Sequence, residues 1–223
     1  MESTNSTVLL ASASPRRRRL ISWLGLAAAV TSVDTPEDLS SPLAAVPAQL
    51  AASIAAEKAV AAREAGAVGP LILAFDTIVV LDDDVLGKPV DLDDAYRMLR
   101  ALSGRTHHVV TGIALLEPEH RAPRTFAVTT RVAMRELSDA DIAEWAAKGE
   151  LMGCAGAYNI EHHLASVSLD ECYQNVAGMP LCHLHAALGS GEVGSVPIGL
   201  TSPVAACDAA LGRTCALGRT LVR

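Results

Sequence analysis

Aromatic residues are scarce in this chain. Phenylalanine, tyrosine and tryptophan make up 3% of its 223 residues, although half of all residues are hydrophobic. Aromatic side chains therefore cannot build most of the core, which must be packed from Ala, Val, Leu and Ile. The length allows one large domain or two small lobes, and it is sufficient to bury a substantial core.

The cysteines contain no CxxC pair, and their number is odd. All of them lie in the last third of the chain, namely Cys154, Cys172, Cys182, Cys207 and Cys215. This pattern argues against a disulfide framework and indicates reduced thiols. A zinc site that combines Cys207 and Cys215 with a histidine is the alternative, although the spacings match no standard zinc motif. The candidate histidines are His162, His163, His183 and His185.

Long apolar runs and a basic excess are also missing. No run approaches the ~20 residues of a membrane-spanning helix, and the first residues, MESTNSTVLL, lack the charged start and apolar core of a signal peptide. We therefore expect a cytoplasmic protein without membrane contact. The formal net charge is −7. Because nucleic-acid-binding proteins usually carry a basic face, this charge argues against nucleic acid and favours a small anion as the partner.

One local basic patch exists in the stretch VLLASASPRRRR, residues 8–19. The pattern predicts a buried strand, a short Ser/Ala turn and a helix that begins at Pro15, because proline fits the first helical position. Backbone N–H groups at a helix start bind anions, and arginine adds bidentate donors suited to phosphate. A solvated helix face is the alternative. Cations at a helix N-terminus oppose the dipole by roughly 0.3–1 kcal/mol each, a cost that a bound anion would relieve.

A lone carboxylate, Asp76, stands inside the apolar stretch LILAFDTIVVL, for which the pattern predicts a strand, an interruption and a hairpin. Burial of an unpaired charge is costly, so Asp76 must meet a cation, a metal ion or an open cleft. Lys88 and the arginines are candidate partners. An aspartate at a strand end that accepts N–H bonds from a turn is the alternative.

Hydrophobic periodicity and breaker residues predict the remaining elements. We expect helices over residues 47–66, 91–102, 138–148 and 204–211 and from Pro180 onward, and strands over residues 27–33, 106–117, 124–137 and 164–169. Residues 189–203 are rich in Gly, Ser and Pro and predict a loose connection.

Six segments, in this order, resemble the Maf family of nucleotide pyrophosphatases: LASASPRRRRLISWLG, AAEKAVAA, AFDTIVVLDDDVLGKP, AYRMLRALSGRTHHVVTGIAL, AGAYNIE and NVAGMPL. The resemblance implies an α/β fold like that of the inosine triphosphate pyrophosphatases, with a mixed elongated sheet, flanking helices and two lobes around a cleft. It also implies a homodimer. We therefore expect a Maf-like domain over residues 1–190 and a C-terminal extension over residues 191–223.

The reaction implied by this resemblance is hydrolysis of a nucleoside triphosphate between the α and β phosphates, which yields a monophosphate and pyrophosphate. By their positions in the matched motifs, Ser14, Arg16 and Arg17 are implied to bind phosphate. Lys58 and Lys88 match the family's two lysines, which neutralise charge on the leaving pyrophosphate.

The resemblance also implies a divalent metal cation, Mg²⁺ or Mn²⁺, which carboxylates hold beside the triphosphate. Asp76 matches the proton acceptor that activates water, directly or as a metal ligand. Glu37 matches the acidic metal ligand of the first long loop. Because this loop aligns poorly, Asp34 is the alternative ligand.

The sequence motifs predict a mixed selectivity for the base of the nucleotide. Arg16 and Thr77 agree with the branch of the family that acts on dTTP and UTP, whereas Glu161 resembles the branch that hydrolyses 7-methyl-GTP. An ionised glutamate can only accept hydrogen bonds, whereas the glutamine usual in the dTTP/UTP branch also donates. We therefore expect selectivity between these two branches, with Thr77 and Glu161 as substrate-binding residues.

The alternative function is a non-catalytic nucleotide-binding regulator of cell division. The enzyme is favoured by the complete set of Arg16, Lys58, Asp76 and Lys88, because a binder has no need of a general base. Tyr158 and Asn175 are weaker candidates for the cleft. We expect the adjacent histidine pairs to be structural or exposed, since neighbours on a strand point to opposite faces.

Overall fold

The structure is a computed structural model that describes residues 8–33, 35–67, 69–190, 194 and 199–222. Within these residues one seven-stranded sheet has the order β2-β1-β3-β5-β6-β7, and β4 pairs with β3. The parallel pairs are β1 with β2 and β1 with β3, and the other pairs are antiparallel. The strands are β1 (Val8–Ala11), β2 (Ala28–Thr31), β3 (Ile72–Leu81), β4 (Asp84–Leu86), β5 (Thr106–Leu116), β6 (Arg124–Met134) and β7 (Ala165–Ser166). The expected mixed α/β sheet is confirmed.

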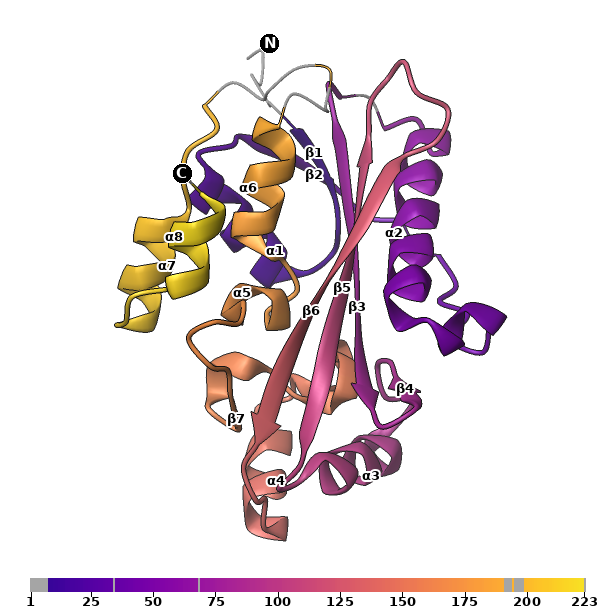
Figure 1. Ribbon diagram of the computed structural model, residues 1–223. Helices are drawn as coiled ribbons and strands as arrows, with labels where there is room; N and C mark the ends of the chain where they lie inside the picture. Colours follow the sequence, from indigo (N-terminus) through magenta and orange to yellow (C-terminus); the bar gives the residue numbers. More distant parts are fainter. Residues whose placement is uncertain (1–7, 34, 68, 191–193, 195–198, 223) are drawn as a thin grey trace.

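Helices cover both faces of this sheet. Figure 1 shows α2 on one face, α1, α5, α6, α7 and α8 on the other, and α3 and α4 near one end of the long strands. None of the described helices is both long and apolar enough to cross a membrane. The helices are α1 (Pro15–Ile21), α2 (Pro47–Glu64), α3 (Leu92–Leu102), α4 (Asp139–Ala146), α5 (Tyr173–Val176), α6 (Leu181–Gly189), α7 (Val204–Leu211) and α8 (Ala216–Leu221).

The helix starts follow their local sequence signals. Ser14 caps α1, where its hydroxyl accepts a hydrogen bond from the Arg17 N–H, and Pro15 is the first helical residue. Ser138 and Asp141 form a reciprocal capping box at the start of α4. Both features confirm expectations that depend only on residues three or four positions apart.

The expected interruption at Asp76 is wrong. Strand β3 runs without a break from Ile72 to Leu81, and Asp76 pairs in register with Gly112 of β5. The strand can continue because Lys58 from α2 reaches the Asp76 carboxylate and supplies the counter-charge that burial demands. Strand β7 is shorter than expected, and helix α8 has no counterpart in the predicted elements.

Helix α2 lies unusually close to the sheet. Its inward face is alanine-rich, with Ala51, Ala55, Ala59 and Ala62 fully buried. A Cβ atom on Gly112 would lie 2.1 Å from the carbonyl carbon and oxygen of Ala51. Small residues on the helix and on the sheet thus make the close approach possible. This approach fixes the distance between the backbone of α2 and strand β3, and therefore the reach of the polar side chains of α2.

Buried His107 makes the fold sensitive to acid. His107 is 1% exposed, and its Nε2 forms a 2.8 Å hydrogen bond with the Tyr158 hydroxyl. Burial lowers the pKa of His107 from 6.5 to about 4. Because the unfolded chain binds this proton more readily, the free energy of unfolding falls as the pH drops from above 6.5 toward 4, by about 2 kcal/mol at pH 5.

We expect His107→Gln to flatten this pH dependence. The variant removes the titrating group, so its unfolding free energy should change less than the wild-type value between pH 7 and pH 5, as measured by urea denaturation. His108→Gln is the matched control, because that neighbouring side chain is exposed. Equal pH slopes in wild type and His107→Gln would contradict the prediction.

Candidate active site

A cleft of about 400 Å³ opens where β1 stops and β3 continues. Ala11, the last residue of β1, pairs with Ala74, and β4 pairs with β3 only from Val79 onward. The edge of β3 between these pairings faces the cleft. The cleft is completed by the turn into α1 and by the segments 153–155 and 176–178. Crevices at the carboxyl end of a parallel strand are common ligand sites in α/β proteins.

Lys58 joins the two predicted metal ligands. Its ammonium lies 2.6 Å from Asp76 Oδ1 and 2.7 Å from Glu37 Oε1, and Lys88 reaches the same Glu37 oxygen at 2.9 Å. Burial by itself raises the pKa of Glu37, but the charges and hydrogen bonds of the two lysines lower it below its ordinary value overall. The cleft therefore holds a continuous chain of alternating charges from Asp76 to Lys88.

The two carboxylate oxygens of Asp76 differ in their hydrogen bonding, since Oδ1 accepts from Lys58. The Asp76 side chain is only 4% exposed, and Oδ2 is buried without a hydrogen-bond partner among the described residues. A buried carboxylate oxygen rarely lacks a partner unless it binds a water molecule or an ion or takes part in catalysis. With Glu37 on the other side of Lys58, the donor set is two carboxylates, which suits a hard divalent cation such as Mg²⁺ or Mn²⁺.

Arg17 is a half-buried part of the cleft wall. It donates to Gly178 O at 2.8 Å through Nε, to Phe75 O at 3.1 Å through Nη1 and to Thr77 Oγ1 at 2.8 Å through Nη2. Burial lowers the pKa of Arg17 to about 10, a shift that the charge of Asp76 opposes. The guanidinium thus stays charged at neutral pH and holds the strand edge to the segment after α5.

Thr77 stands on the other side of β3 from Asp76, as alternation along a strand requires. Its hydroxyl accepts from Arg17 and lies 3.0 Å from the hydroxyl of Thr111, which in turn donates to Asn175 O at 3.1 Å. The predicted substrate residue Thr77 is therefore fixed by a hydrogen-bonded network that extends into the core.

Arg16 and Ser14 also line the cleft. Both Nη atoms of Arg16 lie 3.5 Å from the Cys154 sulfur, and its Nε is buried without a partner among the described residues. The thiol is a weak acceptor, so most of the hydrogen-bonding capacity of Arg16 remains available to a ligand.

The charged residues of the cleft carry a formal net charge of +2, although the whole chain carries −7. Four cations face two carboxylates. They are Arg16, Arg17, Lys58 and Lys88 against Glu37 and Asp76. The positive charge of the cleft creates a local positive electrostatic potential, although the protein as a whole is acidic. This potential would attract a polyphosphate.

Glu161 lies away from these residues. It forms an ion pair with Arg19 and lines a separate cavity of about 600 Å³ together with Trp23 and Arg213. The structure thus brings together Ser14, Arg16, Arg17, Glu37, Lys58, Asp76, Thr77 and Lys88, but it does not bring Glu161 to them. Asp34, the alternative metal ligand, lies outside the described residues.

Several residues of the cleft wall escaped the sequence analysis. Cys154, Gly178 and Ser12 line the cleft, as does Tyr158, which was a weaker candidate. Asn175 does not line it. Its side-chain amide is fully buried and donates to Val109 O and Val128 O, so it supports the wall from behind. The glycine-rich surroundings of Cys154 and Gly178 were the one sequence signal for these segments.

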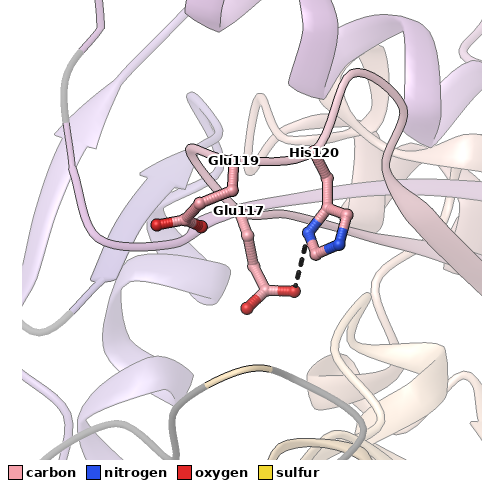
Figure 2. A group of neighbouring side chains, drawn as sticks. All are labelled: Glu117, Glu119 and His120. Carbon is pink, nitrogen blue, oxygen red and sulfur yellow. Dashed lines mark ion pairs between the residues drawn. The ribbon is translucent and has the colours of Figure 1, made fainter.

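A second group of possible ligands lies at the connection between β5 and β6. Figure 2 shows Glu117, Glu119 and His120 there, with an ion pair of 3.2 Å between Glu117 and His120. Glu117 also accepts a 2.6 Å hydrogen bond from the Gly194 N–H. Since its oxygens already have partners and the group does not line the cleft, it is not the predicted metal pair.

Comparisons with known proteins agree with the sequence motifs. A dTTP/UTP pyrophosphatase of Geobacter sulfurreducens is 41% identical over 180 residues, 79% of this chain and 92% of that protein. One of Xanthomonas euvesicatoria is 42% identical over 179 residues, 78% of this chain and 93% of that protein. The Ham1 protein of Staphylococcus aureus aligns in structure over 57% of this chain and 71% of that chain, with 15% identity and a TM-score of 0.38, too low to argue from. The family described as Maf-like protein matches residues 7–190, so this chain belongs to the Maf-like family.

Proposed function

We propose that this chain hydrolyses a nucleoside triphosphate between the α and β phosphates and releases a nucleoside monophosphate and pyrophosphate. The observation that carries the proposal is the surroundings of Asp76, a buried carboxylate at the wall of a positively charged cleft. One of its oxygens is bonded to Lys58, and the other has no partner among the described residues. The names of the relatives, which are pyrophosphatases, support the same reaction class.

In this reaction Asp76 accepts the proton of the attacking water through Oδ2, for which the part of the chain that the structure describes offers no other partner. Lys58 keeps the other oxygen in place and favours the ionised carboxylate. Lys88 is half-exposed at the mouth of the cleft, where it neutralises charge on the leaving pyrophosphate.

Glu37 and Asp76 would hold the divalent cation, since both carboxylates converge on the Lys58 ammonium. When bound, such a cation neutralises phosphate charge and makes a bound water more acidic.

Pyrimidine triphosphates, dTTP and UTP, are the substrates we propose. Arg16 and Thr77 lie in the cleft wall, and the relatives named above are dTTP/UTP pyrophosphatases. The names of these relatives favour the pyrimidine substrates and give no support to the mixed selectivity expected from the sequence. The residue that suggested it, Glu161, is paired with Arg19 outside the cleft.

The experiment compares kcat/KM for dTTP, UTP, CTP, GTP and 7-methyl-GTP with Mg²⁺ or Mn²⁺. The rate is measured from the release of pyrophosphate. We expect dTTP and UTP to exceed the purine nucleotides by at least tenfold. Preference for 7-methyl-GTP would contradict the selectivity, and binding of nucleotide without turnover of any triphosphate would support a non-catalytic regulator instead.

Thr77→Val should lower kcat/KM for UTP by about tenfold, the value of one hydrogen bond to a charged group, about 1.4 kcal/mol. Valine has nearly the same shape but cannot accept from Arg17 or bond to Thr111. Thr77→Ser is the control, because it keeps the hydroxyl. The prediction fails if both variants match the wild type in steady-state kinetics.

Two further expectations stay predictions. The homodimer can be tested by light scattering coupled to gel filtration of the full chain. The cytoplasmic location can be tested by fractionation of the source cells.

A further inference from the structure

A chain of hydrogen bonds runs from the cleft into the core through two threonines. Thr77 of β3 and Thr111 of β5 are direct partners in the antiparallel register, and their hydroxyl oxygens lie 3.0 Å apart. Side chains of directly opposed residues lie on the same face of a sheet. Thr77 lines the cleft, whereas Thr111 is fully buried. Thr111 can therefore act on the cleft through the hydroxyl of Thr77.

The direction of every hydrogen bond in this chain is fixed. A guanidinium only donates, so Thr77 accepts from Arg17 Nη2 at 2.8 Å. A carbonyl only accepts, so the Thr111 hydroxyl gives its single proton to Asn175 O at 3.1 Å. Thr111 then has no proton left for Thr77. The Thr77 hydroxyl therefore donates its own proton to Thr111 Oγ1.

The acceptor at the end of the chain is held rigidly. Asn175 O also accepts a hydrogen bond of 2.9 Å from the Gly178 N–H, so both of its lone pairs are used. The Asn175 side chain donates to Val109 O at 3.1 Å and to Val128 O at 3.0 Å. These bonds fix Asn175 against β5 and β6, and they fix the point to which Thr111 donates.

One lone pair of the Thr77 oxygen remains for a ligand. Thr111 takes the proton of this hydroxyl, and Arg17 takes its other lone pair. Gly178 leaves room beside the oxygen, since a Cβ atom at this position would lie 3.4 Å from Thr77 Oγ1. Toward the cleft, Thr77 is thus an acceptor without a proton to donate.

We propose that Thr111 is a positioning residue that acts through Thr77 and makes the cleft select a base with a ring N–H group. This inference rests on the proposed pyrophosphatase function. Uracil and thymine carry a hydrogen on ring N3, which can donate to Thr77, whereas N3 of cytosine can only accept. The donor of cytosine is its exocyclic amino group, one atom farther along the edge of the base. Two acceptors that face each other form no hydrogen bond and stay desolvated, so cytosine binds less tightly.

Binding of nucleotides that cannot be cleaved tests this inference. We would measure the Kd values of the α,β-methylene analogues of UTP and CTP for the full chain with Mg²⁺ by calorimetry. In these analogues a CH₂ group replaces the bridging oxygen between the α and β phosphates. We expect the UTP analogue to bind the wild type about tenfold more tightly than the CTP analogue, because only the latter leaves the Thr77 acceptor unpaired.

Thr111→Val should reduce this ratio of Kd values to below about threefold, mainly through tighter binding of the CTP analogue. Without the Thr111 oxygen, the proton of Thr77 is free to turn toward the cleft and can donate to N3 of cytosine. The valine leaves Asn175 O with its bond from the Gly178 N–H, so this carbonyl keeps a partner. Thr111→Ser keeps the hydroxyl and should restore the wild-type ratio.

Thr130→Val is the matched control. Thr130 is another fully buried threonine, on β6, and its hydroxyl donates to Cys172 O at 3.2 Å and accepts from Asn175 Nδ2 at 3.1 Å. We expect the wild-type ratio from this variant, because Thr77 still donates to Thr111. Each ratio compares two ligands on the same variant, so a smaller folded fraction leaves it unchanged.

Equal Kd values of the two analogues in the wild type would overturn the inference. The wild-type ratio in Thr111→Val, or a lost preference in Thr111→Ser or Thr130→Val, would do the same, as would a wild type that binds neither analogue. These readouts need no turnover. The base preference can therefore fail while the pyrophosphatase function holds, and hydrolysis can fail while the base preference holds.

Discussion

We expect Asp76→Asn to lower kcat for UTP by about a thousandfold, the middle of the range for loss of a general base. Asparagine keeps the shape of the side chain and can still accept a hydrogen bond from Lys58. It cannot take the proton of the attacking water, and its amide nitrogen is no ligand for a hard cation. The loss should therefore appear in kcat and not in nucleotide binding, which depends on the cations of the cleft.

Asp83→Asn is the matched control for this prediction. Asp83 lies in the exposed turn between β3 and β4, only a few residues away along the chain. We expect wild-type turnover and an unchanged thermal midpoint from Asp83→Asn. A folded Asp76→Asn protein that keeps more than a tenth of wild-type kcat would exclude Asp76 as the proton acceptor.

Gly112→Ala should destabilise the fold by about 3 kcal/mol, the upper part of the range for overpacking a tight contact. The added methyl group would meet backbone atoms of Ala51, which cannot rotate away as a side chain can. Helix α2 must then move off the sheet, and Lys58 moves with it. Because Gly112 pairs with Asp76, the displacement occurs where the Lys58–Asp76 contact is made, and activity should fall together with stability.

Gly189→Ala provides the comparison for Gly112→Ala. Gly189 ends α6, and a Cβ atom there would have no other atom within 4 Å. Chemical denaturation should give a free energy of unfolding for Gly189→Ala at or above the wild-type value, since alanine is the better helix former. Equal stabilities for the two variants would contradict the close packing of α2 on β5.

The parts of the fold that depend on local signals could be predicted from the sequence. The start of α1 at Pro15 and the capping box of α4 rest on residues within one turn of each other. The expected interruption of the strand at Asp76 was a wrong prediction, because the residue that stabilises Asp76 is distant in the sequence. The counter-ion of Asp76 is Lys58, which belongs to helix α2. The residue pattern along one strand does not show which side chain of another element packs against that strand.

The arginine run shows the same limit within the cleft. Residue type identified a basic patch, but successive residues on a helix point about 100° apart, since a turn takes 3.6 residues. Arg16 faces the cleft, Arg17 is half-buried in its wall, and Arg19 pairs with Glu161 on another surface. Cys172, Cys182, Cys207 and Cys215 likewise line one small cavity. Their convergence depends on how α7 and α8 pack, which the spacing along the chain does not encode.

Product identity from UTP tests the central claim most directly. We would follow the reaction of the wild-type chain with UTP and Mg²⁺ by phosphorus NMR, which resolves each phosphate group. Attack between the α and β phosphates, assisted by Asp76 in the positively charged cleft, predicts UMP and pyrophosphate in equal amounts. Formation of UDP and inorganic phosphate, or no product while UTP is bound, would contradict the account.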